Sequence, residues 1–194
     1  MSSPPFHVSL VNVVYTVDVG VTMNLENIFR NTKNCEYNPT RFAALKHRHR
    51  AGGDAPTFLI FPTGKIVCVG CKTPQRARDA SIFLMTHLRN SCGLFLEDGT
   101  HTVRNLVSAS RFPHEIDLVT LASIFPLRCM YEPEVFPGLT YKGGQHTEGA
   151  TFLVFSSGKV VITGVQNEET LPKCVEHMRL ISLLYKRHDK QLGK

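Results

Sequence analysis

Short apolar runs alternate with turns marked by Gly and Pro along most of the chain, which predicts a protein rich in β-strands. The runs contain many Val, Ile, Phe and Tyr residues, the types that favour strands. In the first half of the chain, strands are expected over residues 8–19, 35–38, 42–50, 57–61 and 66–70. Gly64 lies between two of these runs and is expected to form a hairpin turn.

Two helices interrupt this pattern in the first half. Leu25, Ile28 and Phe29 follow the i, i+3, i+4 spacing of one apolar helix face and predict a short helix. A long helix is expected to begin after Thr73-Pro74, because Thr is a favoured cap and Pro a favoured first helical residue.

The same pattern occurs twice, at a step of 94 residues. Phe42 recurs as Phe136 and Phe61 as Phe155, since 136 − 42 and 155 − 61 both equal 94. The second copy is expected to contain a strand at 103–110, a helix at 115–125, strands within 128–164 and a helix at about 167–186. Two copies are too few for a solenoid. The sequence therefore predicts one pseudo-twofold structure.

The paired strands are apolar on both faces. In the run 58–69, Phe58 and Ile60 occupy one face and Leu59 and Val67 the other. Antiparallel sheets usually keep one face polar. If the helices all cover one face, the other is an open apolar binding surface. The alternative is that both faces are buried, in a sandwich or a dimer.

Composition and charge narrow the class of protein. Lys and Arg number 22 against 16 Asp and Glu, giving a net charge of +6 and a pI of about 9.1. A basic surface attracts polyanions. No apolar run could span a bilayer, the first residues do not resemble a signal peptide, and the six cysteines are expected to be reduced thiols. These features argue against a secreted or membrane-spanning protein.

Polar and basic residues accompany the second apolar face. Asn12 and Asn105 punctuate it, and the flanking segments carry Arg41, Lys46, Arg48, Arg50 and Lys142. A DNA minor groove offers apolar sugar surface, hydrogen-bond acceptors on its A·T floor, and phosphates along both edges. An apolar face with amide donors and a basic rim suits such a groove.

These residues resemble the TATA-binding protein family from about Leu10 to Lys186, in both copies. The segments that carry the resemblance include 11–14, 35–44 and 58–67, followed by 131–139 and 155–161. The resemblance implies an α+β fold: a pseudo-twofold saddle with a curved ten-stranded antiparallel sheet and four helices on its convex face. It divides the chain into a short N-terminal segment (1–9), a first repeat (10–98), a second repeat (99–188) and a C-terminal tail (189–194).

The resemblance also assigns roles to individual residues. The intercalating side chains are Phe42, Phe61, Phe136 and Phe155. The minor-groove floor is Asn12, Val14, Leu59, Val67, Val69, Asn105, Val107, Leu153, Val161 and Thr163. The phosphate contacts are Arg41, Arg48, Lys65, Lys72, Lys142 and Lys159. Wedging of side chains between base steps of a bent duplex is a mechanism for which the TATA-binding protein is itself a standard example.

Partners follow from the same resemblance. The implied function is a nuclear general transcription initiation factor that binds and bends A·T-rich, TATA-like promoter DNA and recruits other factors. Glu132, Glu134 and Val135 resemble the segment that contacts a transcription factor IIB-like protein. A transcription factor IIA-like protein and other regulators are further candidates, and DNA-free chains are candidates for dimerisation through the apolar face.

Two departures from the family leave an alternative open. Val69 replaces a base-contacting threonine that Thr163 retains, and the hairpins 46–56 and 142–149 are longer than usual. The alternative is a divergent protein-interaction adaptor with weak or no TATA binding.

No enzyme, cofactor or metal site is expected. The Ser, His and Asp residues form no recognisable catalytic triad, and no phosphate-binding loop motif occurs. Cys68 and Cys71 have no second cysteine pair nearby, and cysteines three apart on a regular strand point to opposite faces. His47 and His49 are expected to be solvated or to face phosphates.

Overall fold

The computed structural model describes residues 6–49 and 55–191. Arg50 and parts of the expected terminal segments, 1–9 and 189–194, lie outside the described residues. Within the described residues, the chain forms ten strands, four α-helices and one 3₁₀-helix, and the strands belong to one antiparallel sheet. The expected α+β class with ten strands and four helices is confirmed. Two compact units divide the chain: residues 12–105, and residues 106–191 with 6–11.

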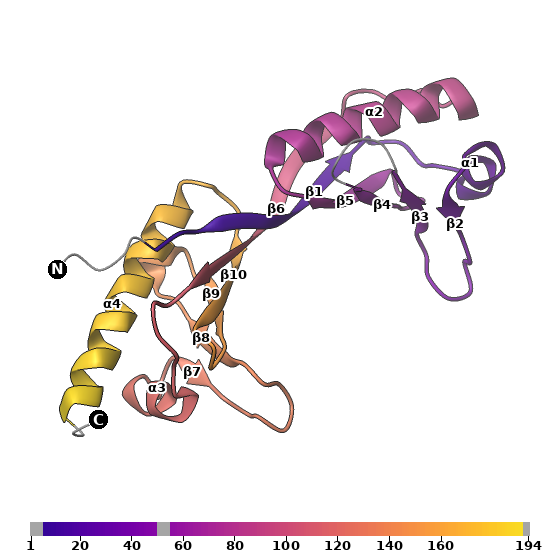
Figure 1. The fold of residues 1–194 in the computed structure, drawn as a ribbon. Helices are drawn as coiled ribbons and strands as arrows, with labels where there is room; N and C mark the ends of the chain where they lie inside the picture. Colours follow the sequence, from indigo (N-terminus) through magenta and orange to yellow (C-terminus); the bar gives the residue numbers. More distant parts are fainter. Residues whose placement is uncertain (1–5, 50–54, 192–194) are drawn as a thin grey trace. The chain divides into compact units, whose positions relative to one another are not determined.

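The first half contains five strands and two helices (Figure 1). Their order in the sheet is β2-β3-β4-β5-β1. The strands are β1 (Ser9–Asp18), β2 (Cys35–Glu36), β3 (Leu45–Arg48), β4 (Thr57–Ile60) and β5 (Lys65–Cys71). The helices are α1 (Leu25–Asn31) and α2 (Pro74–Cys92).

The second half repeats this arrangement. Its strands follow the order β6-β10-β9-β8-β7. They are β6 (Thr100–Arg111), β7 (Cys129–Met130), β8 (Leu139–Lys142), β9 (Thr151–Val154) and β10 (Lys159–Val165). The α-helices are α3 (Leu118–Ile124) and α4 (Thr170–Gln191), and a 3₁₀-helix, η1, covers Gln145–Thr147.

Local sequence signals fix the ends of these elements. Thr73 caps α2, where its hydroxyl accepts a hydrogen bond from Arg76 N–H at 3.2 Å, and Pro74 is the first helical residue. Gly64 turns the β4–β5 hairpin with φ +91°, a conformation that residues with a Cβ rarely adopt. Its counterpart Gly158 has φ +81°. The predicted helix start and both hairpin turns are therefore confirmed.

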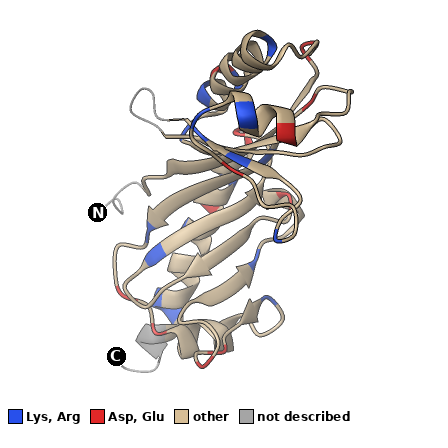
Figure 2. Ribbon diagram, turned by 90° about the vertical axis from the view of Figure 1, so that its right-hand side faces the viewer, with Lys and Arg blue, Asp and Glu red and all other residues tan. Residues whose placement is uncertain are grey.

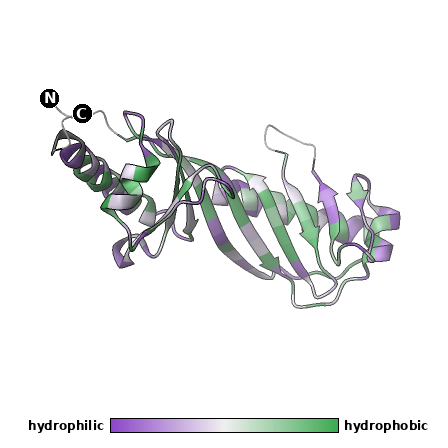
Figure 3. Cartoon of the chain, turned by 90° about the horizontal axis from the view of Figure 1, so that it is seen from below, coloured by the Kyte–Doolittle hydropathy of each residue, from purple (hydrophilic) through white to green (hydrophobic). Residues whose placement is uncertain are grey.

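Each half has a helix-covered face and a second face. Phe58 and Ile60 are fully buried on the first, where α2 packs against β5 (Figure 1). Leu59 alternates with them and is half-buried on the second face, opposite Val67 in the register of β4 and β5. Figure 3 shows that the strands carry many hydrophobic residues. The structure thus has the two apolar faces that the sequence predicts for these strands: one is covered by helices, and the other is not.

A bulge changes which face the end of β5 presents. The β1–β5 register shifts between Val13 and Tyr15, and Gly70 has φ +96°. Cys68 and Cys71 consequently lie on the same side, both buried, with their sulfur atoms 4.0 Å apart. The expectation that these cysteines point to opposite faces was wrong, because it assumed a regular strand.

Two predicted strands are markedly shorter than expected. In the segment 35–38, β2 covers only Cys35–Glu36. The segment 42–50 was predicted as a strand, but β3 covers only Leu45–Arg48. Phe42 lies in a turn, where its N–H donates to the Asn38 carbonyl at 3.0 Å. The Asn38 side chain stabilises this turn by accepting hydrogen bonds from Thr40 N–H at 3.2 Å and from the Thr40 hydroxyl at 2.7 Å.

None of the helices in the described ranges combines the length and the apolar character that crossing a membrane requires.

Candidate nucleic-acid interface

The face without helices presents the apolar floor residues of each half. In the first half, Leu59 lies opposite Val67, and Val69 lies opposite Thr57. All of the residues assigned to the floor are half-buried: Asn12, Val14, Leu59, Val67, Val69, Asn105, Val107, Leu153, Val161 and Thr163. Side chains on adjacent strands thus form a continuous surface within each half that is accessible and largely apolar.

The second half has the same pairs with one chemical difference. Leu153 lies opposite Val161, and Thr163 lies opposite Thr151. The position of Val69 in the first half is thus occupied by a hydroxyl-bearing residue in the second. Valine and threonine have similar shapes, but only threonine can donate a hydrogen bond.

A hydrogen bond to the backbone orients the Asn12 side chain. Its Oδ1 accepts from Gly70 N–H at 2.8 Å. The amide oxygen is therefore engaged within the protein, and the NH₂ group supplies the donors that remain for a ligand. The acceptors on the floor of an A·T minor groove require donors of this kind.

An aromatic pair lies at one end of the floor in the first half. The rings of Phe42 and Phe61 are 6.2 Å apart at their centroids and inclined at 71°. Phe42 comes from the turn before β3 and is 50% exposed, while Phe61 follows β4 directly. Two partly exposed aromatic rings held against each other in this way can act as a rigid wedge.

The second half has an equivalent pair. Phe136 and Phe155 have ring centroids 5.8 Å apart and an interplanar angle of 67°. Gly138 lies against both rings, and a Cβ at this glycine would be only 2.7 Å from the Phe136 ring and 3.1 Å from the Phe155 ring. The corresponding residue in the first half is Ala44. This contact between a glycine and two rings was not found from the sequence, since nothing there shows the rings meeting over residue 138.

The proposed phosphate contacts are all exposed side chains, and they fall into two groups. Figure 2 shows Lys and Arg on elements of both halves. Within the described part of the chain, these have no ion-pair partner: Arg41, Lys65, Lys72 and Lys159. Arg48 pairs with Glu36 at 3.4 Å, and Lys142 donates to the Thr151 hydroxyl at 3.1 Å.

Glu36 is a residue that the sequence reasoning missed. It lies on β2 opposite Lys46 and forms ion pairs at 3.4 Å with both Lys46 and Arg48. These side chains are largely exposed, so the pairs contribute little to stability. Glu36 instead competes with an external anion for two cations at this edge of the sheet. Opposite charges on neighbouring strands would have been the signal, but the strand register was needed to see it.

The acidic segment of the second half forms an exposed turn. Val135 N–H and Phe136 N–H both donate to the Glu132 carbonyl at 3.0 Å. Glu132 and Glu134 are exposed, and Val135 is 79% exposed. The turn therefore presents two carboxylates and an apolar side chain to solvent, directly before Phe136.

His47 of β3 and His49, just after this strand, do not face the apolar floor. His47 is buried on the helix-covered side, 6.1 Å from the Phe58 ring, and His49 is half-buried 5.0 Å from the Phe83 ring of α2. The expectation that they are solvated or face phosphates was therefore wrong. His47 and His49 flank Arg48 in the sequence, so their side chains point to the face opposite the one that carries Arg48.

Burial makes several of the cysteine thiols poor nucleophiles. It raises the pKa of Cys35 and of Cys129 to about 11, and that of Cys68 still further. The thiolate is the reactive form, so such thiols are inert near neutral pH. Among the described residues, no group of three or more His, Cys, Asp or Glu side chains is arranged to hold a metal ion.

The fold and this surface define a class: a two-repeat antiparallel β-sheet protein that has apolar side chains and asparagines on the helix-free face of each half, and exposed Lys and Arg side chains in both halves. Comparison with known proteins makes the class specific. A model of the family described as "Transcription factor TFIID (or TATA-binding protein, TBP)" matches residues 7–91 and 100–183. The chain belongs to the TATA-binding protein family, and the two repeats are those of this family.

Individual relatives support the same assignment. The chain is 37% identical to TATA-box-binding protein 2 of Entamoeba histolytica over 183 residues, covering 94% of this chain and 84% of that protein. It is 35% identical to the TATA-box-binding protein of Acanthamoeba castellanii, covering 92% and 67%. Among solved structures, Methanococcus jannaschii TBP matches with a TM-score of 0.77 and 30% identity, covering 93% of this chain and 99% of that one.

Proposed function

We propose that this protein is a general transcription initiation factor that binds TATA-like, A·T-rich promoter DNA in the minor groove and bends it. The observation that carries the proposal is the same set of side chains on the helix-free face of each half. Each half has an aromatic pair beside apolar floor residues, and in each the family's amide position is occupied by Asn. The names of the relatives favour this function over a DNA-independent adaptor.

The chemistry of the floor suits A·T base pairs. Leu59, Val67 and their counterparts contact sugars and base edges, while the NH₂ group of Asn12 donates to adenine N3 or thymine O2. Fully burying an exposed Val or Leu side chain contributes about 1.5–3 kcal/mol, and the floor side chains, which are already half-buried, contribute a part of this on binding. Guanine would place its amino group among these side chains and donors, which disfavours G·C pairs at the centre of the site.

The aromatic pairs produce the bend. Phe42 with Phe61, and Phe136 with Phe155, enter between base steps at the two ends of the contacted segment. Unstacking costs a few kcal/mol per step and is offset by the additional protein surface that a bent duplex covers. Because the rings of each pair already contact one another, the wedges are preorganised before DNA binds.

The basic side chains hold the phosphates and make affinity dependent on salt. The proposed contacts are Arg41, Arg48, Lys65, Lys72, Lys142 and Lys159. Each phosphate that is neutralised releases counterions, so affinity falls as salt concentration rises. Arg48 must exchange its Glu36 partner for a phosphate, so it contributes less than the unpaired lysines.

The protein also serves as a platform for other initiation factors in the nucleus. The turn with Glu132, Glu134 and Val135 presents two carboxylates and an apolar side chain, which suits a basic surface on a transcription factor IIB-like protein. A transcription factor IIA-like protein is a second candidate at the first hairpin, of which residues 50–54 lie outside the described residues. The repeats are proposed to cover residues 10–98 and 99–188, and DNA-free chains to dimerise through their apolar faces.

Selection from a randomised duplex pool tests the proposed function. The bound fraction should be enriched in A·T-rich sites of about one turn of DNA, and its affinity should fall steeply with salt. A pool that stays random in sequence, or a protein that captures a factor IIB-like partner while retaining no duplex, would support the adaptor instead. The turn variant Glu132→Lys/Glu134→Lys should lose the factor IIB-like partner without losing DNA.

A further inference from the structure

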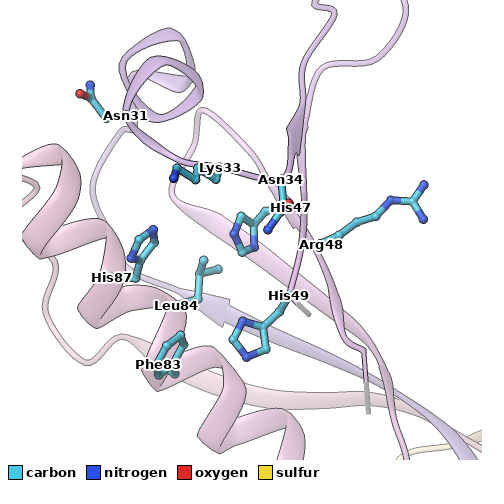
Figure 4. Close-up of a pocket in the computed structure, with 9 residues that line it drawn as sticks. All are labelled: Asn31, Lys33, Asn34, His47, Arg48, His49, Phe83, Leu84 and His87. Carbon is cyan, nitrogen blue, oxygen red and sulfur yellow. The ribbon is translucent and has the colours of Figure 1, made fainter. Parts of the chain in front are cut away.

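A cavity of about 340 Å³ lies in the first half, on the side of β3 that faces helix α2 (Figure 4). Three segments enclose it: the chain after α1, the strand β3 with the residue that follows it, and α2. It is lined by Asn31, Lys33, Asn34, His47, Arg48, His49, Phe83, Leu84 and His87. The cavity is distinct from the proposed DNA-binding surface, because successive side chains of β3 point to opposite faces of the sheet and His47 lies on the helix-covered face.

The walls of the cavity are flat rings. The Phe83 and His49 rings are 5.0 Å apart, and the His47 and His87 rings are 6.4 Å apart with an interplanar angle of 38°. Leu84 adds an aliphatic contact from α2. Surfaces of this kind pack well against a planar apolar group.

The polar lining is rich in donors, and none of the described residues that line the cavity is a carboxylate. Lys33 is exposed at the cavity and forms no ion pair within the described segments. Arg48, in contrast, points away from the other lining side chains in Figure 4 and pairs with Glu36. Among the described lining residues, Lys33 is therefore the cation that remains for a ligand, and none of these residues carries a negative charge that would repel an anion.

One buried polar group of the lining has no partner. His47 is only 7% exposed, and its Nδ1 has no hydrogen bond within the part of the chain that the structure describes. A buried polar atom without a partner costs free energy. Lys33 and His87 line the same cavity, so a ligand could form hydrogen bonds with them and with the His47 imidazole.

The second half satisfies the equivalent position from within. Tyr141 corresponds to His47 at the 94-residue step. Its hydroxyl lies 3.0 Å from His177 Nε2, and His177 Nδ1 lies 2.8 Å from His146 Nε2. The second repeat thus completes a chain of hydrogen bonds at this position, whereas the first repeat has a polar ring at the edge of a cavity.

We propose that this cavity binds a small organic anion, consisting of a flat apolar group that carries a carboxylate or a phosphate. The apolar group packs against the exposed sides of the rings of α2 and of the β3 segment, and the anionic oxygens accept hydrogen bonds from Lys33 and from imidazole N–H groups. The cavity volume falls in the range of about 300–1,000 Å³ that is usual for small-molecule sites. This site is additional to DNA binding and does not depend on it.

Titration of the full chain with simple probes tests the proposal. The probes are benzoate, phenyl phosphate, inorganic phosphate, and benzamide as an uncharged analogue of benzoate. Histidine ring signals, followed by nuclear magnetic resonance, should shift saturably for His47 and His87 with benzoate or phenyl phosphate, and markedly less with benzamide. Comparison of the first two probes identifies the preferred anion.

Two variants with the same change in charge distinguish binding in the cavity from non-specific binding of anions to a basic protein. Lys33→Ala should weaken binding about five-fold or more, while Lys186→Ala, on α4 in the other half, should leave it unchanged. Equal effects of the two variants, or equal binding of inorganic phosphate and phenyl phosphate, would overturn the proposal. So would histidine signals that no probe shifts. Because Lys33 is exposed, Lys33→Ala is expected to fold like the wild-type protein, which thermal unfolding checks.

Discussion

The rings of Phe136 and Phe155 pack against each other with centroids 5.8 Å apart, and only a glycine, Gly138, fits against them. In the first half the same position holds Ala44, and the Phe42–Phe61 centroids are 6.2 Å apart. The two aromatic pairs are therefore built on different backbone supports. The difference makes the second pair sensitive to a change of one methyl group.

We expect Gly138→Ala to impair the second wedge. The added Cβ would lie 2.7 Å from the Phe136 ring and must displace it. DNA affinity should fall about ten-fold or less, and the bend at that end of the site should decrease. Fluorescence energy transfer across each half-site measures this. The matched variant Ala44→Gly should have a smaller effect, so equal effects at both ends would contradict the explanation.

Val69→Thr should strengthen the preference for A·T pairs in the first half-site. Val69 lies opposite Thr57 in the same register as Thr163 opposite Thr151, so a hydroxyl at residue 69 has the local setting that Thr163 already has. One added hydrogen bond is worth about 0.5–1.5 kcal/mol. Competition between duplexes with G·C substitutions in one half-site measures the gain. Thr163→Val should produce the opposite change at the other half-site, and a gain at both half-sites would contradict the assignment.

Asn12→Asp should weaken DNA binding without unfolding the protein. The aspartate oxygen can still accept from Gly70 N–H, which Asn12 Oδ1 does at 2.8 Å, but the NH₂ donors are lost and a negative charge faces the groove. Affinity should fall about ten-fold or more, given the value of hydrogen bonds near charges. Equilibrium binding with thermal unfolding as the control measures this. Wild-type affinity would show that Asn12 does not contact the base edges.

Stability should decrease as the pH falls from about 6.5 toward 4. Burial, followed by the neighbouring His146 and Arg128, lowers the pKa of His177 to about 4. The unfolded chain takes up a proton near pH 6.5 that the folded chain refuses, so unfolding becomes easier by at most about 1.4 kcal/mol per pH unit for this group. Urea unfolding at pH 7 and pH 5 measures the loss. It should be smaller in His177→Gln, and an unchanged loss would contradict this role.

The sequence predicted most of the fold because its signals were local and repeated. The period-2 apolar runs, Thr73-Pro74 and the hairpin glycines each specify an element without help from distant residues. The 94-residue repeat allowed each element to be predicted twice, once in each copy. The segment around Phe42 was predicted as strand but forms a turn, because hydrogen bonds to the Asn38 side chain compete with extended structure.

Features of the site that depend on contacts between separate segments could be found only from the structure. The sequence placed Leu59, Val67 and their counterparts on one face, and the coordinates place them there. It could not show that Gly138 supports two rings, because that contact depends on how two separate turns approach. The bulge at Gly70, which brings Cys68 and Cys71 together, depends on the register with β1. Such features arise from pairing between strands, which no single segment encodes.

The bend angle of a TATA-like duplex is the most direct test of the account. Fluorescence energy transfer between dyes at the two ends of a short A·T-rich duplex should show strong bending by the wild-type protein. The double variant Phe61→Ala/Phe155→Ala should remain folded, because both residues lie at the half-buried surface, and should bend the duplex much less. A straight duplex in the wild-type complex, or an undiminished bend with the double variant, would contradict the claim that these rings wedge open the minor groove.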